Sequence, residues 1–237
     1  MILVFDVGDT LVYKEPTQDK VIADRFMQVG ISLTEQEARC MHQITELRIA
    51  EQIWRENQGA PRMADQEFFH YIDQSMLNVP WVANRLTNEN AEKFFMTQSL
   101  MHQKKIVHPE TYSVLRALQQ NHRMGIISNY TADLMDFLQE TALAGYFETI
   151  VISEMVGCEK PDAKIYSVFC EQMNCCPDEC VYIGDHPFDI LGAKQAGMKA
   201  IWLNHIYDAM PDYISERADA TANNLYDIVN ICKTHDW

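Results

Sequence analysis

The pattern of apolar and polar positions divides the chain into two kinds of region. Residues Ile2–Phe5 form a continuous apolar run that ends at Asp6, which is typical of a strand buried on both faces of a parallel sheet. From Pro109 onward, short apolar runs alternate with stretches of helical periodicity. Because strands that alternate with helices pair in parallel through right-handed crossovers, this pattern predicts a doubly wound, Rossmann-like α/β fold.

The expected elements of this region can be placed from the same pattern. We expect strands over 124–127, 149–152, 180–183 and 200–203, and helices over 109–121, 132–142, 163–173 and 188–196. Pro109 occupies a favourable position in the first turn of its helix. Gly197 follows the last of these helices and is a favoured helix-ending residue.

The segment between the first strand and the alternating region has helical periodicity only. We expect helices over 17–29, 34–57, 64–77 and 87–102, and no strand. Thr34 followed by Glu37 is the pattern of a capping box. The sequence therefore predicts an α/β core domain over 1–13 and 107–237, interrupted by an all-helical cap domain over 14–106. Insertions of this kind often act as lids over a site.

Composition narrows the classes of partner. The 237 residues carry a formal charge of 19 − 34 = −15, with 47% hydrophobic and 22% charged positions, so disorder is not expected. Binding to nucleic acid or to an anionic membrane surface needs an excess of Lys and Arg, and we expect neither. No apolar run approaches the roughly 20 residues of a membrane span. The N-terminus lacks the basic stretch of a signal peptide, and the expected location is the cytoplasm.

The seven cysteines fit the same expectation. An odd number without a secretory signal favours reduced thiols over a disulfide framework. Four of them are close in sequence: Cys170, Cys175, Cys176 and Cys180. A zinc site is one interpretation, but no Cys-x-x-Cys pair is present, so buried or incidental thiols are the favoured interpretation.

Ligands of open parallel sheets bind beyond the carboxyl ends of the strands. The polar residues that follow the expected strands are Asp6, Gly8, Asp9 and Thr10, then Ser128 and Asn129, then Glu159, Lys160 and Asp162, and finally Asp185, His186 and Asp189. Carboxylates gathered in this way repel one another, and Mg²⁺ with oxygen ligands is the usual relief. The metal, Lys160 and Ser128 could then hold a phosphoryl or carboxylate group against Asp6, whose carboxylate is a competent nucleophile.

At these positions the chain resembles the haloacid dehalogenase-like (HAD) hydrolase superfamily, with the cap of its first cap subclass. Four ordered motifs carry the resemblance: Asp6-Val7-Gly8-Asp9-Thr10-Leu11, Ile127-Ser128-Asn129, Lys160-Pro161 and Gly184-Asp185-x-x-x-Asp189. The resemblance implies that Asp6 is the nucleophile and that Ser128 and Lys160 act on the transferring group. It also implies a Mg²⁺ site that comprises Asp6, the backbone carbonyl of Gly8, Asp185 and Asp189. Thr10 would shape the nucleophile loop, and Thr10 and Asn129 would complete the substrate-binding set.

One position departs from the family's pattern. Phosphatases of this superfamily usually have an aspartate general acid/base two residues after the nucleophile, where this chain has Gly8. Asp9 and His186 are candidate substitutes, and the loss of positioned acid–base catalysis costs roughly 10² to 10⁴ in rate. The leading hypothesis is a Mg²⁺-dependent phosphatase that acts on a small phosphorylated metabolite. A dehalogenase- or phosphonatase-like hydrolase and a HAD-fold binding protein with weak or no activity stay open as alternatives.

Overall fold

The computed structural model describes residues 1–97, 102–205, 207 and 217–237. The chain forms two compact units, one of Met1–Tyr13 and Ile106–Trp237 and the other of Lys14–Lys105. We refer to them as the α/β unit and the helical unit. None of the described helices has the length and apolar character needed to cross a membrane.

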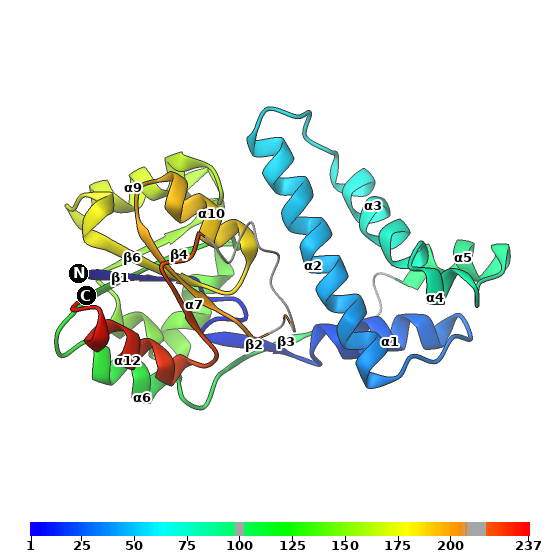
Figure 1. Ribbon diagram of the computed structural model, residues 1–237, viewed down its shortest axis with the longest axis horizontal. Helices are drawn as coiled ribbons and strands as arrows, with labels where there is room; N and C mark the ends of the chain where they lie inside the picture. Colours follow the sequence, from blue (N-terminus) through cyan, green and yellow to red (C-terminus); the bar gives the residue numbers. More distant parts are fainter. Residues whose placement is uncertain (98–101, 206, 208–216) are drawn as a thin grey trace. The chain divides into compact units, whose positions relative to one another are not determined.

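A six-stranded sheet forms the centre of the α/β unit (Figure 1). Its order is β5-β4-β1-β6-β7-β8, and every neighbouring pair is parallel. The strands are β1 (Ile2–Phe5), β4 (Arg123–Ser128), β5 (Thr149–Ile152), β6 (Cys180–Gly184), β7 (Lys199–Leu203) and β8 (Ala220–Ala222). β1 lies between β4 and β6, with Ile2 in register with Arg123 on one side and with Cys180 on the other. The predicted α/β fold is confirmed.

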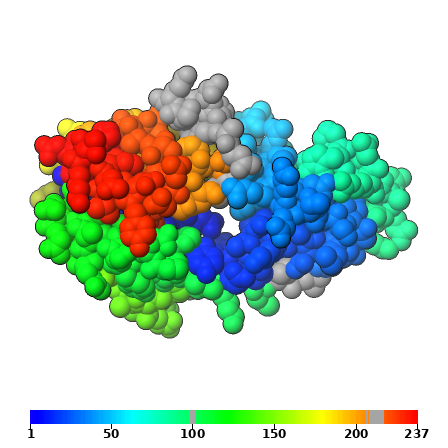
Figure 2. Space-filling view, turned by 60° about the horizontal axis from the view of Figure 1, so that its bottom comes forward, coloured from blue at the N-terminus to red at the C-terminus, as the bar shows by residue number. Residues whose placement is uncertain are grey.

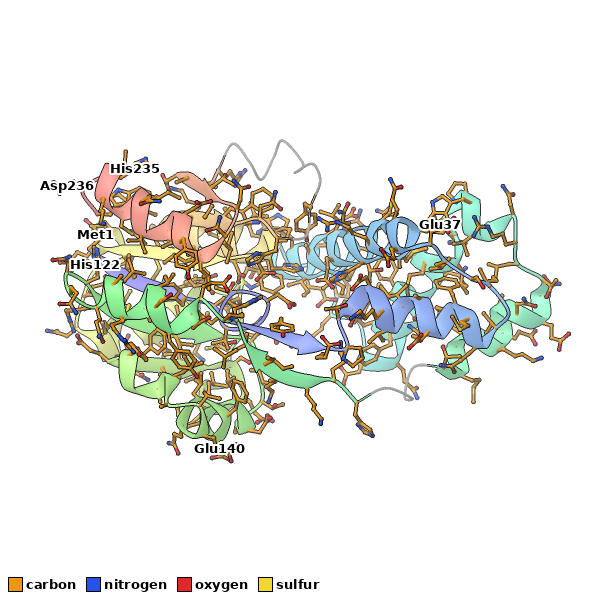
Figure 3. The ribbon with its side chains drawn as sticks, turned by 90° about the horizontal axis from the view of Figure 1, so that it is seen from below. Met1, Glu37, His122, Glu140, His235 and Asp236 are labelled. Atoms are coloured by element: carbon orange, nitrogen blue, oxygen red, sulfur yellow. The ribbon has the colours of Figure 1, made fainter. Side chains whose placement is uncertain are left out.

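Helices cover both faces of this sheet. They are α6 (Thr111–Leu118), α7 (Asp133–Glu140), α8 (Ser153–Val156), α9 (Ala163–Met173), α10 (Pro187–Gln195) and α12 (Leu225–Thr234). α9 and α10 pack together against one face, and α6 and α12 lie side by side on the other (Figure 1). Figure 2 shows the C-terminal residues in red against the green segment that contains α6. At the end of the sheet where β1 begins, the His122 ring lies 3.4 Å from the carbonyl of Met1 (Figure 3).

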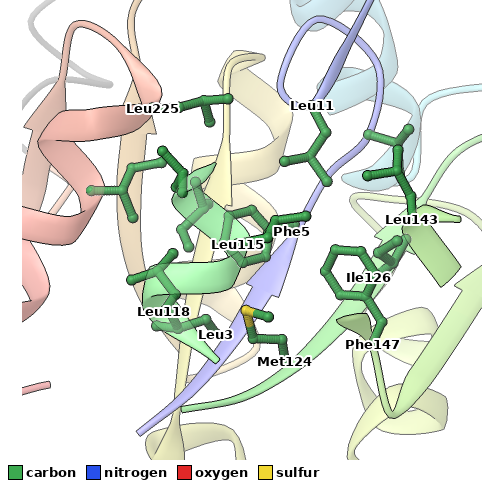
Figure 4. Packing of buried hydrophobic residues seen from close by; sticks show 14 of the residues in the cluster. Leu3, Phe5, Leu11, Leu115, Leu118, Met124, Ile126, Leu143, Phe147 and Leu225 are labelled. Atoms are coloured by element: carbon green, nitrogen blue, oxygen red, sulfur yellow. The ribbon is translucent and has the colours of Figure 1, made fainter. Parts of the chain in front are cut away.

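The apolar side chains of β1 explain the central place of this strand. Leu3 and Phe5 are fully buried and pack in one cluster with Leu115 and Leu118 of α6 and with Met124 of β4 (Figure 4). All four residues of β1 are buried, as expected of a strand with a helix layer on each face. The polar residues that follow β1 are thereby held at a fixed place on the sheet edge.

The helical unit contains α1 (Gln18–Gln28), α2 (Glu35–Asn57), α3 (Asp65–Leu77), the short α4 (Pro80–Ala83) and α5 (Asn88–Phe94). Its core gathers apolar side chains at helical spacing: Ile22, Phe26, Met41, Ile72, Met76, Val82 and Phe94. The capping box at Thr34 is present, with the Glu37 N–H donating to the Thr34 hydroxyl and the Thr34 N–H donating to the Glu37 carboxylate. Of the expected helix over 87–102, the described residues form α5 up to Phe94 and a 3₁₀ turn over Phe95–Thr97. Residues 98–101 of this expectation lie outside the described residues.

The pattern of apolar positions did not predict several of the observed elements. The expectation of no strand in the insertion is wrong, because β2 (Val12–Glu15) pairs with β3 (Lys104–Val107) where the chain enters and leaves the helical unit. Two of the four residues in each strand are charged, as the sequences VYKE and KKIV show, so neither strand forms a continuous apolar run. α6 begins at Thr111 rather than at Pro109, and the loop before Gly157 contains the single turn α8. β8 and α12 complete the sheet and its cover beyond the last expected strand.

Candidate active site

Asp6 is placed at the sheet edge by the end of β1. Its backbone N–H donates to the carbonyl of Ile183 at 2.9 Å, so the first residue after β1 is still tied to β6. The side chain is buried, with 7% of its surface exposed. Burial raises the pKa of Asp6 to about 6, against the attraction of Lys160. The carboxylate therefore stands in a site that favours added positive charge.

Lys160 is fully buried and reaches Asp6 from the loop between α8 and α9. Its Nζ lies 2.6 Å from Asp6 Oδ1 and 2.7 Å from Asp189 Oδ1. It also donates to the hydroxyl of Tyr182 at 2.9 Å. Burial by itself would lower the pKa of Lys160, but the carboxylates of Asp189 and Asp6 raise it above its usual value. The ammonium is therefore charged at neutral pH and fixes one oxygen of the nucleophile candidate.

Asp185 follows β6 and is held by two neighbours. The Thr10 hydroxyl donates to Asp185 Oδ1 at 3.1 Å, and the Trp202 indole N–H donates to the Asp185 carbonyl at 3.0 Å. Burial raises the pKa of Asp185 well above its usual value, and the nearby charges of Asp9 and Asp6 act in the same direction. The hydroxyl of Thr10 thus positions a carboxylate of the site.

Asp189 lies in the first turn of α10 and points back toward the end of β6. Its Oδ2 accepts the backbone N–H of His186 at 3.3 Å. A Cβ at position 184 would come within 2.5 Å of this same oxygen, so the close approach of Asp189 to the strand requires Gly184. Asp185 precedes His186, the N-cap of α10, so of the two aspartates only Asp189 lies within the helix.

Two further expected site residues lie at the carboxyl end of β4. Ser128 is its last residue, is 1% exposed and pairs in register with Ile152 of β5. The side chain of Asn129 bonds to the backbone of Lys160 twice, since its Nδ2 donates to the carbonyl at 2.9 Å and its Oδ1 accepts the N–H at 2.7 Å. Asn129 therefore positions the lysine-bearing loop in this structure.

Three carboxylates meet in the space that these contacts define. One oxygen from each of Asp6, Asp185 and Asp189 lies within 4.8 Å of the others, and all three residues are buried. Lys160 compensates part of this charge, and the raised pKa values of Asp6 and Asp185 reflect the remainder together with burial. Hard oxygen donors with surplus negative charge are the ligand set that Mg²⁺ prefers. The residues present therefore fit a divalent cation.

Gly8 leaves space beside this cluster. A Cβ built at position 8 would have the Asp6 Oδ2 atom, 4.0 Å away, as its nearest neighbour. The left-handed conformation in this loop belongs to Asp9, with φ of 52°, and Asp9 donates its N–H to the carbonyl of Val12 at 2.6 Å. Neither the backbone nor the packing demands glycine at position 8.

Other groups near the site were missed or given different roles by the sequence. Tyr182 is fully buried within β6 and donates its hydroxyl to the carbonyl of Ile127 at 3.1 Å, yet its position in an apolar run suggested only core packing. The rings of His108 and His205 stack at 5.7 Å, and burial lowers the pKa of His205 to about 4. The candidate proton carrier His186 caps α10 and accepts the Phe188 N–H through Nδ1.

Comparison with known proteins gives the same family as the motifs. A family model described as haloacid dehalogenase-like hydrolase matches residues 3–203. The pyrimidine 5'-nucleotidase YjjG of Escherichia coli is 34% identical over 131 residues, which cover 54% of this chain and 57% of that protein. A glyceraldehyde 3-phosphate phosphatase of Methanothermobacter thermautotrophicus is 35% identical over 112 residues, or 46% and 50% of the two chains. The chain spans about half the length of the curated relatives it matches.

Solved structures share the fold over nearly the whole chain. A HAD phosphatase from Thermococcus onnurineus superposes with a TM-score of 0.56 at 23% identity and covers 97% of this chain and 96% of its own. The HAD-hydrolase YfnB from Bacillus subtilis, solved bound to magnesium, has a TM-score of 0.61 at 20% identity and covers 97% of each chain. With the family model, the motif order and the sheet in agreement, the chain belongs to the haloacid dehalogenase-like hydrolases.

Proposed function

We propose that this hydrolase is a Mg²⁺-dependent phosphatase that cleaves a small phosphorylated metabolite through an aspartyl-phosphate on Asp6. The observation that carries the proposal is the buried contact of 2.6 Å between Lys160 Nζ and Asp6 Oδ1 beside two further carboxylates. An ammonium on one oxygen of a nucleophile leaves the other oxygen available for attack. Relatives named as phosphatases and as a nucleotidase support phosphate monoesters as the substrate class.

The reaction assigns a role to each residue. An oxygen of Asp6 attacks phosphorus while the bond from phosphorus to the leaving oxygen breaks, and water then cleaves the aspartyl-phosphate to give phosphate and free Asp6. Ser128 and Lys160 bind the phosphoryl oxygens. Asp6, the Gly8 carbonyl, Asp185 and Asp189 would hold Mg²⁺, which neutralises phosphoryl charge when bound. Thr10 and Asn129 position Asp185 and Lys160.

Gly8 supports a second candidate activity. Because position 8 offers no carboxylic acid to protonate a leaving group, the site suits leaving groups that depart without a proton, as a halide does. A haloacetate dehalogenase of Moraxella is 27% identical over 125 residues, and structural neighbours include dehalogenases. The surplus of carboxylates beside Asp6 favours the metal-dependent phosphatase.

The test is hydrolysis of p-nitrophenyl phosphate by the full chain with and without Mg²⁺, beside Asp6→Asn and a halide-release assay on chloroacetate. We expect Mg²⁺-dependent phosphate release that Asp6→Asn abolishes, and no halide release. Halide release without phosphate release would replace the proposal by dehalogenation. If neither product exceeds the Asp6→Asn background, the proposal gives way to a binding protein with the HAD fold.

A further inference from the structure

Three cysteine sulfurs meet at the edge of the sheet opposite the candidate active site. Cys170 lies in α9, Cys175 in the connection after it, and Cys180 at the start of β6. Each sulfur lies within 4.8 Å of the other two, and Cys175 Sγ is 3.6 Å from Cys180 Sγ. β6 runs from Cys180 to the residue before Asp185, so about 16 Å of extended chain separate the two clusters.

Backbone contacts bring these thiols together. α9 ends at Asn174 in the left-handed conformation, with φ of 51°. The N–H of Cys175 then donates to the carbonyl of Cys170 at 3.0 Å, which turns the chain back over the last helical turn. Pro177–Glu179 form a 3₁₀ turn that leads into β6, and Glu179 accepts the N–H of Cys176 at 2.7 Å. The cluster is therefore held by the loop and not by contacts between sulfurs alone.

The spacing suits thiolate coordination of a metal. Zinc–sulfur bonds of about 2.3 Å place tetrahedral sulfur ligands about 3.8 Å apart. The separation of 3.6 Å between Cys175 Sγ and Cys180 Sγ is close to this value, and the other two separations do not exceed 4.8 Å. Cys170 and Cys180 are buried, whereas Cys175 is half-buried and gives access from the surface. The described residues place no fourth histidine, cysteine or carboxylate ligand within the same distance of all three. A water ligand would complete a tetrahedral site, or three sulfurs alone a trigonal one.

The charges around the cluster favour a cation over a role as a nucleophile. The charge that acts on Cys170 is the carboxylate of Glu179, which repels other anions. Reactive cysteines stand beside positive groups instead.

We propose that Cys170, Cys175 and Cys180 bind one soft metal ion of the Zn²⁺ or Cu⁺ class and thereby tie α9 to the start of β6. Soft thiolate ligands select these ions. The thiols that are still protonated release their protons to solvent as the metal–sulfur bonds form. The ion stabilises the fold at a place remote from the reaction, and the proposal is independent of the substrate and of the Mg²⁺ site.

The test is titration of the reduced, chelator-treated full chain with Zn²⁺ and, without oxygen, with Cu⁺, in excess Mg²⁺ to protect the acidic site. We expect one tightly bound ion per chain with three sulfur ligands by X-ray absorption, and a higher Tm. Whichever ion binds more tightly identifies the class. Cys175→Ser should weaken binding at least about 100-fold, since even outer-shell changes cost 10- to 100-fold. Cys40→Ser, which removes another half-buried free thiol, should leave binding unchanged.

A second measurement needs no variant and so does not depend on folding of the mutants. Alkylation with iodoacetamide followed by mass spectrometry should show that the added ion protects Cys170, Cys175 and Cys180, while the exposed Cys176 reacts as before. The proposal fails if the reduced chain binds neither ion, if the bound ion has oxygen ligands, or if Cys175→Ser and Cys40→Ser behave alike. Equal protection of Cys176 would also overturn it.

Discussion

Among the described residues, each unit contains one buried Lys or Arg side chain, and the two differ in the number of carboxylates around them. In the helical unit, Arg25 meets the single carboxylate of Asp73 through two parallel hydrogen bonds of 2.9 Å. Its Nε donates to Thr97 at 3.0 Å and its guanidinium lies 4.3 Å from the centre of the Phe94 ring. In the α/β unit, Lys160 bonds to two carboxylates, with a third in the same cluster.

The difference in charge compensation distinguishes a contact that stabilises the fold from a candidate binding site. A bidentate pair of one cation and one anion compensates both charges in place. A cluster of three carboxylates around one ammonium keeps surplus negative charge in a buried space, at a cost in stability. Surplus of that kind is expected where a cation and an anionic substrate bind. Loss of Lys160 should therefore reduce activity above all, and loss of Arg25 should reduce stability.

The largest effect is expected from Lys160→Met. The change removes the ammonium that contacts Asp6 Oδ1 and that would face the phosphoryl group in the proposed reaction. Loss of one such charge-stabilising donor costs about 10² to 10³ in kcat. Phosphatase assays at saturating substrate and Mg²⁺ measure it. Lys194→Met is the matched control, because Lys194 pairs with Asp219 at the surface of the same unit, and it should retain full activity. A Lys160→Met enzyme with more than a tenth of the original kcat would remove Lys160 from the proposed reaction.

Arg25→Met tests the other side of the comparison. It removes the guanidinium that pairs with the buried carboxylate of Asp73. Breaking a buried ion pair in this way should lower the free energy of unfolding by about 3–5 kcal/mol. The double change Arg25→Met/Asp73→Leu should recover most of this loss, since an apolar replacement of both partners is often neutral. Urea unfolding of the three chains measures the difference. If the double variant is no more stable than Arg25→Met, the loss of stability does not come from the charge left on Asp73.

Gly8→Asp sharpens the account of the reaction itself. A Cβ at position 8 would have Asp6 Oδ2, 4.0 Å away, as its nearest neighbour, and a carboxylic acid there can protonate the leaving group. We expect at least about a tenfold rise in turnover of an alkyl phosphate, at the low end of general acid–base effects, and a smaller rise for p-nitrophenyl phosphate. Gly8→Asn adds a side chain of similar size without the proton, and it should give no gain. Equal gains from Asp and Asn would point to packing instead.

The smallest expected effect is a pH-dependent stabilisation by Mg²⁺. The pKa of Asp6 is about 6 in the folded chain against 3.8 ordinarily. Between these values the folded chain holds a proton that the unfolded chain has lost, so the stability from this group is present below pH 3.8 and lost as pH rises through 6. Mg²⁺ at the proposed site would bind the ionised form, so it should raise Tm by several degrees more at pH 7.5 than at pH 5. Thermal unfolding by circular dichroism measures this difference. An equal increase at both pH values would contradict the coupling.

The fold could be predicted to the extent that its elements bury apolar runs. β1, β4, β5, β6 and β7 each contain a largely buried run that the periodicity located. β2 and β3 could not be found in this way, because their stability comes from pairing with each other across 88 intervening residues, from Pro16 to Gln103. The same reason applies to β8, a three-residue strand with only one buried position.

The candidate site also has features that the sequence predicted and features that it did not. The order of the strands' carboxyl ends determined that Asp6, Lys160, Asp185 and Asp189 would meet, since parallel strands bring their following residues to one edge. The two hydrogen bonds between the Asn129 side chain and the Lys160 backbone depend on the folded chain, and the sequence did not predict them.

The sequence by itself determined the α/β class, the order of the motifs and the candidate residues of the site, because these depend on local apolar period and on residue type. Only the tertiary structure decided which side chains compensate which charges. Lys160 and Asp6 are 154 residues apart, and the three sulfurs of Cys170, Cys175 and Cys180 meet through the turn that ends α9. Contacts of this kind depend on distances of a few ångströms that backbone packing sets, and the apolar period of the sequence does not contain them.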